Sequence, residues 1–245
     1  MMSTSKEWFR TWFDSPYYHL LYQNRDHDEA KAFIDSILSH LQLDTPSSIL
    51  DLACGRGRHS EYLSLKGHQV TGVDLSVNNI KYAKENSKSK VHFDVHDMRE
   101  VYRQNAYNLI LNLFTSFGYF DDDKENIDTL KAMREDLTED GIIVLDFLNG
   151  KKAVNNLPSA EEIERSGISF LINRKLVGKW ITKEIQFTDQ GTAYDFEEKV
   201  RYIELSDFQK YLLEADLKIK DIFGSYELLP FDESSSERLI FFLSR

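Results

Sequence analysis

The segment at residues 49–58 limits the possible folds of this chain more than any other. Its first four residues are apolar except for Asp51 and predict a buried strand. Gly55 and Gly57 follow, and residues without a Cβ let the backbone turn sharply and let a ligand approach closely. The helix expected next begins with unpaired N–H groups. The segment therefore predicts a strand, a turn and a helix built around a ligand site.

A second acidic residue stands where a nucleotide-binding fold needs one. Residues 69–74 form another short apolar stretch that ends at Asp74, 23 positions after Asp51. In strand–helix–strand nucleotide folds, an acid about 20 residues beyond the glycine turn binds the ribose hydroxyls. The alternative role for Asp74 is a helix cap. The spacing favours the first interpretation and predicts a cofactor that contains a nucleoside.

Strands and helices alternate along the first part of the chain. Strands are expected near 48–52, 69–74, 90–94, 107–113 and 141–148, and helices near 57–66, 76–86 and 122–138. Such alternation predicts a parallel sheet with helices on both faces. With strand-like stretches at 218–226 and 238–243, it predicts an α/β Rossmann-like fold with a seven-stranded, mostly parallel sheet.

The segments around this core have different periods. Residues 1–43 carry apolar side chains at helical spacing and predict an N-terminal helical lid. Apolar and charged residues alternate from Tyr194 to Tyr202, which predicts an antiparallel strand in a small sheet over residues 151–203, inserted after the fifth strand. Further strands of that sheet are expected near 168–175 and 181–187. The cofactor-binding core then comprises residues 44–150 and 204–245.

Composition argues against several classes of protein. The 30 Lys and Arg against 41 Asp and Glu leave a net charge of −11, which disfavours nucleic acid or an anionic membrane as a partner. Cys54 is the only cysteine, so an intramolecular disulfide is excluded and a cytoplasmic location is expected. The sequence has no apolar run of about eighteen residues, and its histidine spacing predicts no metal site.

The glycine spacing discriminates between two classes of cofactor. A dinucleotide requires Gly-x-Gly-x-x-Gly, but a reading from Gly55 places Gly57 second and Ser60 third. The pattern present is Asp51-x-Ala53-x-Gly55-x-Gly57. An NAD(P)-dependent oxidoreductase is therefore kept as an alternative, and a non-catalytic cofactor-binding module is another.

This pattern resembles the first motif of the class I S-adenosylmethionine-dependent methyltransferases, acid-x-Gly-x-Gly-x-Gly, with Ala53 at the first glycine. The order of elements and the late antiparallel insert look like the small-molecule branch related to glycine and sugar N-methyltransferases. The resemblance implies transfer of a methyl group from S-adenosyl-L-methionine to nitrogen or oxygen of a small-molecule acceptor. Residues 112–115 lack the Asn-Pro-Pro-aromatic signature of adenine amino methyltransferases, which also disfavours a nucleic-acid substrate.

The resemblance also implies roles for individual residues. Asp74 would accept hydrogen bonds from the ribose hydroxyls, and Asp97 would accept one from the adenine amino group, although Asp97 has the alternative role of capping a turn. Asp51 would orient the glycine turn or the cofactor ammonium, and His19 or Arg25 would bind the cofactor carboxylate. The expected cofactor-binding residues are Tyr18, Arg25, Asp51, Ala53, Gly55, Gly57, Asp74, Leu75, Asp97, Met98, Leu113 and Phe114.

The acceptor side of the site is expected at the carboxyl ends of the strands, where ligands of open sheets bind. Methyl transfer is a displacement in which the sulfonium already activates the methyl group, so the enzyme chiefly aligns the reactants in a dry pocket. The candidates for a base or an acceptor contact are His19, Tyr119, Asp146 and Asn149.

Overall fold

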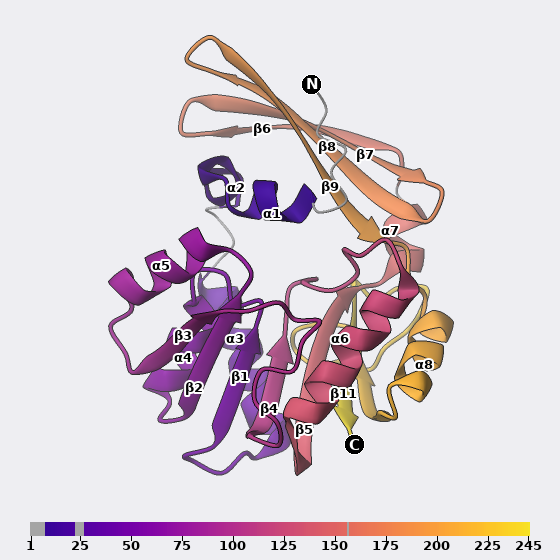
Figure 1. Cartoon of the computed structure of the whole chain (residues 1–245). Helices are drawn as coiled ribbons and strands as arrows, with labels where there is room; N and C mark the ends of the chain where they lie inside the picture. The colour runs from indigo at the N-terminus through magenta and orange to yellow at the C-terminus, as the bar shows by residue number, and fades with distance from the viewer. Residues whose placement is uncertain (1–7, 23–26, 156) are drawn as a thin grey trace.

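A seven-stranded sheet forms the centre of the computed structural model, which describes residues 8–22, 27–155 and 157–245 (Figure 1). In spatial order its strands are β10 (Lys218–Phe223), β11 (Arg238–Ser244), β5 (Leu137–Leu148), β4 (Tyr107–Asn112), β1 (Ser48–Leu52), β2 (Gln69–Asp74) and β3 (Val91–Val95). Strands β5, β4, β1, β2 and β3 are parallel, whereas β11 is antiparallel to both β5 and β10. The predicted Rossmann-like, mostly parallel sheet is confirmed.

Helices cover both faces of this sheet, because the side chains of each strand alternate between two apolar layers. One layer contains Ile49 and Leu109 and packs against α3 (His27–Leu41) and α4 (Arg58–Leu65). The other contains Leu50 and Ile110 and packs against α6 (Asp123–Asp136) and α8 (Leu205–Glu214). Helix α5 (Val77–Asn86) packs along β2 and β3.

Local capping sets the ends of the helices. The Ser76 hydroxyl accepts a hydrogen bond from the Asn79 N–H at 3.0 Å and caps α5, so the cap of this helix is Ser76 and not Asp74. The helix expected over 122–138 ends at Asp136, because the next residue already pairs with β4 as part of β5.

The residues after β5 form a separate four-stranded antiparallel sheet, reached through α7 (Gly150–Asn155). Its strands in order are β6 (Ser159–Arg165), β7 (Ile168–Val177), β8 (Trp180–Asp189) and β9 (Thr192–Arg201). The last three match the expected strands. Strand β6 was not predicted, because it holds three glutamates, which are depleted in strands, and packs into the apolar cluster through Ile163.

The N-terminal helices lie between the two sheets. Figure 1 shows the small sheet above the carboxyl ends of the parallel strands, with α1 (Trp8–Phe13) and α2 (Pro16–Leu21) below it. Trp8 and Trp12 of α1 belong to the same buried cluster as Phe170 and Phe187 of the small sheet. Helix α3 packs on the central sheet instead, so the helical segment expected over residues 1–43 divides between two places.

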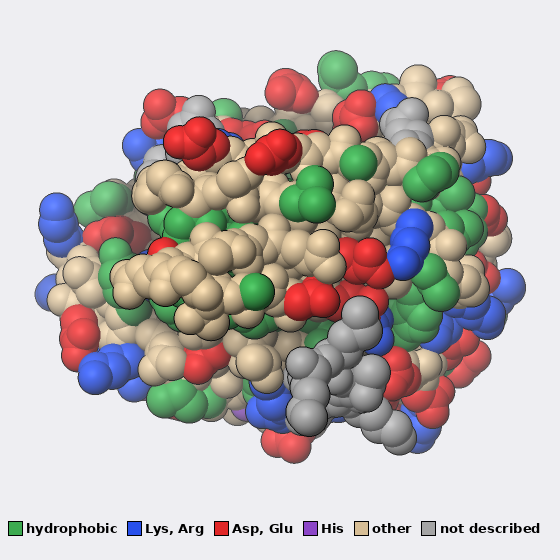
Figure 2. All heavy atoms as spheres, turned by 90° about the horizontal axis from the view of Figure 1, so that it is seen from above, with side chains coloured by type: hydrophobic (Ala, Val, Ile, Leu, Met, Phe, Trp, Pro, Cys, Tyr) green, Lys and Arg blue, Asp and Glu red, His purple; other side chains and the backbone are tan. Residues whose placement is uncertain are grey.

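The outer face of the small sheet is mixed in character. Leu171, which alternates with the buried Phe170 and Ile172 along β7, is exposed. Seen from above in Figure 2, hydrophobic side chains are scattered among charged ones. Within residues 8–22, 27–155 and 157–245, no helix has the length and apolar character needed to cross a bilayer.

Candidate active site

A cavity of about 1240 Å³ opens at the carboxyl ends of β1, β2 and β4, and α1, α2 and the small sheet contribute to its walls. It brings together these expected cofactor-binding residues: Tyr18, Asp51, Ala53, Gly55, Gly57, Asp74, Leu75, Asp97, Met98, Leu113 and Phe114. Arg25 lies outside the described residues. The acceptor candidates His19 and Tyr119 also line the cavity, whereas Asp146 and Asn149 do not.

The glycine turn after β1 takes a left-handed backbone at every second residue. Ala53, Gly55 and Gly57 have φ angles of 63°, 57° and 81°. A Cβ on Gly57 would lie 2.6 Å from the ring of Phe93, so only glycine fits there, whereas a Cβ on Gly55 would meet nothing within 4 Å. The turn therefore packs against the fold at Gly57 and leaves open space at Gly55.

Asp74 lies at the end of β2 and ties this turn to the start of α5. Its carboxylate accepts hydrogen bonds from the N–H of Gly55 at 2.8 Å and from the N–H of Ser76 at 2.8 Å. Burial raises the pKa of Asp74, although both backbone hydrogen bonds act in the opposite direction. The carboxylate retains lone pairs for hydroxyl donors from a ligand, since two oxygens offer about four acceptor positions.

Asp51 lies deeper in the same wall. It accepts a hydrogen bond from the Ser60 hydroxyl at 2.5 Å, which joins β1 to α4. Burial raises the pKa of Asp51 to about 6, even though the Ser60 hydrogen bonds lower it. An acid of this kind is available to a cationic ligand group near the glycine turn.

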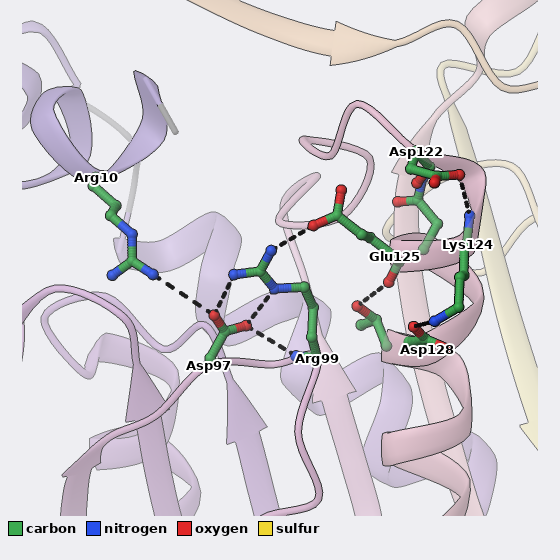
Figure 3. A network of polar contacts seen from close by, with 9 residues as sticks. Arg10, Asp97, Arg99, Asp122, Lys124, Glu125 and Asp128 are labelled. Atoms are coloured by element: carbon green, nitrogen blue, oxygen red, sulfur yellow. Dashed lines mark hydrogen bonds and ion pairs between the residues drawn. The ribbon is translucent and has the colours of Figure 1, made fainter. Parts of the chain in front are cut away.

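Asp97, in the loop after β3, belongs to a network of charged groups (Figure 3). Arg99 donates to its two oxygens at 2.9 and 2.6 Å, and Arg10 of α1 approaches it at 3.8 Å. Arg99 also reaches Glu125 of α6 at 2.5 Å. Burial would raise the pKa of Asp97, but the hydrogen bonds and the charge of Arg99 outweigh it and lower the pKa. The network holds an ionised carboxylate at the cavity wall.

The aromatic and imidazole groups of the helical segment also reach the cavity. Burial, and then the charge of Arg56, lower the pKa of His19 to about 4, so its imidazole is neutral at pH 7. The Tyr18 ring lies 5.2 Å from the imidazole of His19 and 5.0 Å from the ring of Phe13. The hydroxyl of Tyr119 donates to the carbonyl of Thr115.

The other two acceptor candidates are buried beside the cavity. Asp146 is fully buried and forms an ion pair with Arg238 at 2.7 Å. The amide of Asn149 donates to the carbonyls of Glu233 and Ser236 at 2.9 and 2.8 Å, in the loop between β10 and β11. Both residues lie at the carboxyl end of β5, as expected. Their side chains, however, contact Arg238 and the loop between β10 and β11 and do not line the cavity.

Sequence reasoning missed three charged residues that the small sheet contributes. Arg174 of β7 lies opposite Lys183 of β8, and Lys183 lies opposite Glu198 of β9, so the three form a row across the sheet. All three line the cavity. Glu198 also accepts hydrogen bonds from Trp12 at 2.6 Å and from Tyr22 at 2.7 Å. The alternation along each strand predicts which side chains lie on the same face of the sheet. Only the strand register shows that Arg174, Lys183 and Glu198 are neighbours on that face.

The site has the groups that an adenosyl cofactor needs. Its wall offers open space beside Gly55, the carboxylates of Asp74 and Asp97, and the apolar side chains of Leu75 and Met98. Among the residues whose placement is described, no three His, Cys, Asp or Glu side chains gather as ligands for a metal ion.

Comparison with known proteins gives a consistent set of relatives. A family described as a methyltransferase domain matches residues 49–141. The putative methyltransferase YqeM of Bacillus subtilis is 26% identical over 204 residues, which cover 79% of this chain and 82% of that protein. A dTDP-3-amino-3,4,6-trideoxy-alpha-D-glucopyranose N,N-dimethyltransferase of Streptomyces venezuelae is 24% identical and covers 84% of this chain and 91% of that protein.

A solved structure agrees in fold. The crystal structure of an S-adenosylmethionine-dependent methyltransferase from Clostridium acetobutylicum matches with a TM-score of 0.79 and 22% identity, over 93% of this chain and 95% of that one. These relatives give no support to the oxidoreductase or the non-catalytic module considered from the sequence.

Proposed function

We infer that this chain, which is a class I S-adenosylmethionine-dependent methyltransferase, transfers the methyl group to an amine nitrogen of a small polar molecule. S-adenosyl-L-methionine is its cofactor and supplies a methyl group that the sulfonium has already activated. The choice of nitrogen over oxygen rests on the aromatic lining of the cavity.

Aromatic side chains from α1, α2 and the segment after β4 surround one part of the cavity. The ring centroid of Tyr119 lies 5.6 Å from that of Trp8 and 5.3 Å from that of Phe13. Tyr18 and Phe9 complete the group, and all five residues line the cavity. Aromatic faces attract ammonium groups through cation–π interactions. A methylated amine carries such a charge and a methyl ether does not, so this lining favours nitrogen.

The charged row across the small sheet supports a polar acceptor. The Nζ of Lys183 lies 3.7 Å from Glu198 Oε2, and the two side chains are 13% and 16% exposed. Charges that are this far buried contribute strongly to recognition, because water screens them little. The Streptomyces venezuelae relative, whose name describes an amino-sugar N,N-dimethyltransferase, is consistent with an amine of this kind.

We propose that the predicted residues hold the cofactor. Asp74 would accept the ribose hydroxyls, Asp97 the adenine amino group, and Asp51 with the glycine turn would face the methionyl ammonium. Of the two residues expected to bind the cofactor carboxylate, His19 is the one whose position the structure describes. Its neutral imidazole would donate a hydrogen bond to that carboxylate. The chain's remaining task is to exclude water and align the amine with the methyl group.

The positions of these residues also suggest which parts of the chain bind the cofactor and which bind the acceptor. We propose that residues 44–150 and 204–245 form the cofactor-binding core, and that α1, α2 and the sheet within residues 151–203 form the acceptor side. The net charge of −11 supports a small molecule over nucleic acid as the acceptor, and the single buried cysteine supports a cytoplasmic enzyme.

The proposal is tested with matched pairs of acceptors. Methyl-labelled S-adenosylmethionine is incubated with a panel of amino sugars and amino acids and with analogues in which a hydroxyl replaces the amine. We expect label on amines and none on the hydroxyl analogues. Transfer to the hydroxyl analogues, or to none of the panel while S-adenosylhomocysteine still binds, would contradict the proposed acceptor class.

A further inference from the structure

The turn that follows β4 has a backbone that needs outside support. Phe114 and Thr115 are consecutive non-glycine residues with φ angles of 57° and 60°. L-residues rarely adopt this left-handed conformation, and it persists where the surrounding structure holds it. Both residues line the cavity at the carboxyl end of β4. The strain therefore lies in the wall of the site.

A buried carboxylate supplies that support. Asp146 of β5 accepts a hydrogen bond from the N–H of Phe114 at 2.7 Å on its Oδ2, and its backbone carbonyl accepts one from the N–H of Thr115 at 3.1 Å. The same aspartate thus binds both strained amides. Asp146 is fully buried, so these bonds form in a medium of low dielectric constant, where they are strong.

Arg238 of β11 completes the clamp. Its Nε donates to Asp146 Oδ1 at 2.8 Å, and its Nη2 donates to the Thr115 hydroxyl at 2.9 Å. The strand partner of Asp146 is Ile240, two residues after Arg238. The antiparallel register of β11 on β5 therefore brings Arg238 close to Asp146. Burial raises the pKa of Asp146, and the charge and hydrogen bond of Arg238 act against this shift without reversing it. The guanidinium therefore offsets part of the cost of burying the carboxylate.

The clamped turn is also linked to the cofactor side of the cavity. The Phe114 ring stacks on the imidazole of His59 at 5.1 Å, and the guanidinium carbon of Arg58 lies 4.5 Å from its centroid. Both partners belong to the first turn of α4, directly after the glycine turn. A shift of the backbone at Phe114 would therefore change the wall where cofactor and acceptor meet.

We infer that Asp146 and Arg238 are a pair of positioning residues, which hold the strained Phe114–Thr115 turn in the shape required for methyl transfer. The inference builds on the proposed function, because the turn is assigned to the meeting point of the cofactor and the amine. Asp146 acts through the turn and not as a base, since its carboxylate is buried away from the cavity.

The test compares Asp146→Asn with Asp136→Asn. An asparagine that keeps its oxygen toward Arg238 turns its NH₂ toward the Phe114 N–H, so two donors face each other. Asp136 is a matched control: like Asp146 it is buried and accepts backbone N–H groups, those of Tyr102 and Arg103 at 3.0 and 2.7 Å, but these two residues do not line the cavity. Arg238→Lys is a second variant, which keeps the charge but loses the fork of donors.

Three measurements are made on each variant. We expect Asp146→Asn to speed amide hydrogen exchange at Phe114 by at least about tenfold. With an amine from the acceptor panel, kcat should fall by at least about tenfold, while KM and the Kd for S-adenosylhomocysteine change less than about threefold. Arg238→Lys should reproduce the loss of kcat, and Asp136→Asn should lower Tm alone.

Unchanged exchange at Phe114 in Asp146→Asn, or a loss of kcat no larger than in Asp136→Asn, would overturn the inference. The exchange measurement needs no acceptor. If no amine of the panel is methylated, that result counts against the proposed function. The rate of amide hydrogen exchange at Phe114 in Asp146→Asn, compared with wild type, still decides whether Asp146 holds the turn.

Discussion

The carboxylate of Asp74 accepts a hydrogen bond from the backbone N–H of Gly55 at 2.8 Å, which joins the end of β2 to the glycine turn after β1. The two residues that first indicated a nucleoside cofactor are thus in direct contact, and both line the cavity. Because Asp74 supports the turn and also lines the cavity, we expect a change at this position to act on cofactor affinity in two ways.

Asp74→Ala should weaken the binding of S-adenosylhomocysteine by more than about tenfold, since charge-assisted hydrogen bonds are worth about 1.5–3 kcal/mol. Isothermal calorimetry measures the change. Asp128→Ala, which removes an acid from the exposed ion pair with Lys124, is the control and should leave the Kd unaltered. Equal affinities for wild type and Asp74→Ala would show that Asp74 does not contact the cofactor.

The two glycines of the turn should respond differently to alanine. Gly57→Ala places a methyl group 2.6 Å from the Phe93 ring and is expected to lower stability by about 1–3 kcal/mol, seen as a lower Tm. Gly55→Ala meets open space, so its cost in stability should be smaller. Its added methyl group should instead weaken S-adenosylhomocysteine binding. The reverse order of the two Tm values would refute the assigned geometry of the turn.

Asp51 should make stability depend on pH. Burial raises its pKa from 3.8 to about 6, so between these values the folded protein binds more protons than the unfolded chain. The contribution of Asp51 to the free energy of unfolding therefore falls by up to about 3 kcal/mol as the pH rises from about 4 to about 6. Urea unfolding of wild type and Asp51→Asn from about pH 4 to pH 7 measures the difference. A difference that does not change with pH would rule out the raised pKa.

Lys183→Met should raise the KM of a polar amine acceptor several-fold and leave the Kd for S-adenosylhomocysteine unchanged, because Lys183 lies in the wall that the small sheet contributes. Lys175→Met is a matched control on the neighbouring strand, since Lys175 pairs with Glu184 outside the cavity lining. Steady-state kinetics separate the two variants. An equal effect of both would mean that the charged row does not recognise the acceptor.

Much of the fold could be read from the sequence because its signals are local. The apolar run at Ile49–Leu52, the glycines at 55 and 57 and the cap at Ser76 each act within a few residues, and the structure has the expected elements there. Strand β6 was not predicted, because its glutamates are uncommon in strands and suit a solvated edge. It forms by pairing with β7, and its own sequence does not show that pairing.

The sequence by itself determined the parallel core, the glycine turn and the acids that line the cavity, because these follow from short-range spacing. The tertiary structure alone decided which residues the small sheet contributes to the cavity wall. It placed Arg174, Lys183 and Glu198 in one row through strand register, and it turned Asp146 from a candidate base into the buried partner of Arg238, 92 residues away. Contacts over such separations depend on how strands pair and pack, and no local pattern encodes them.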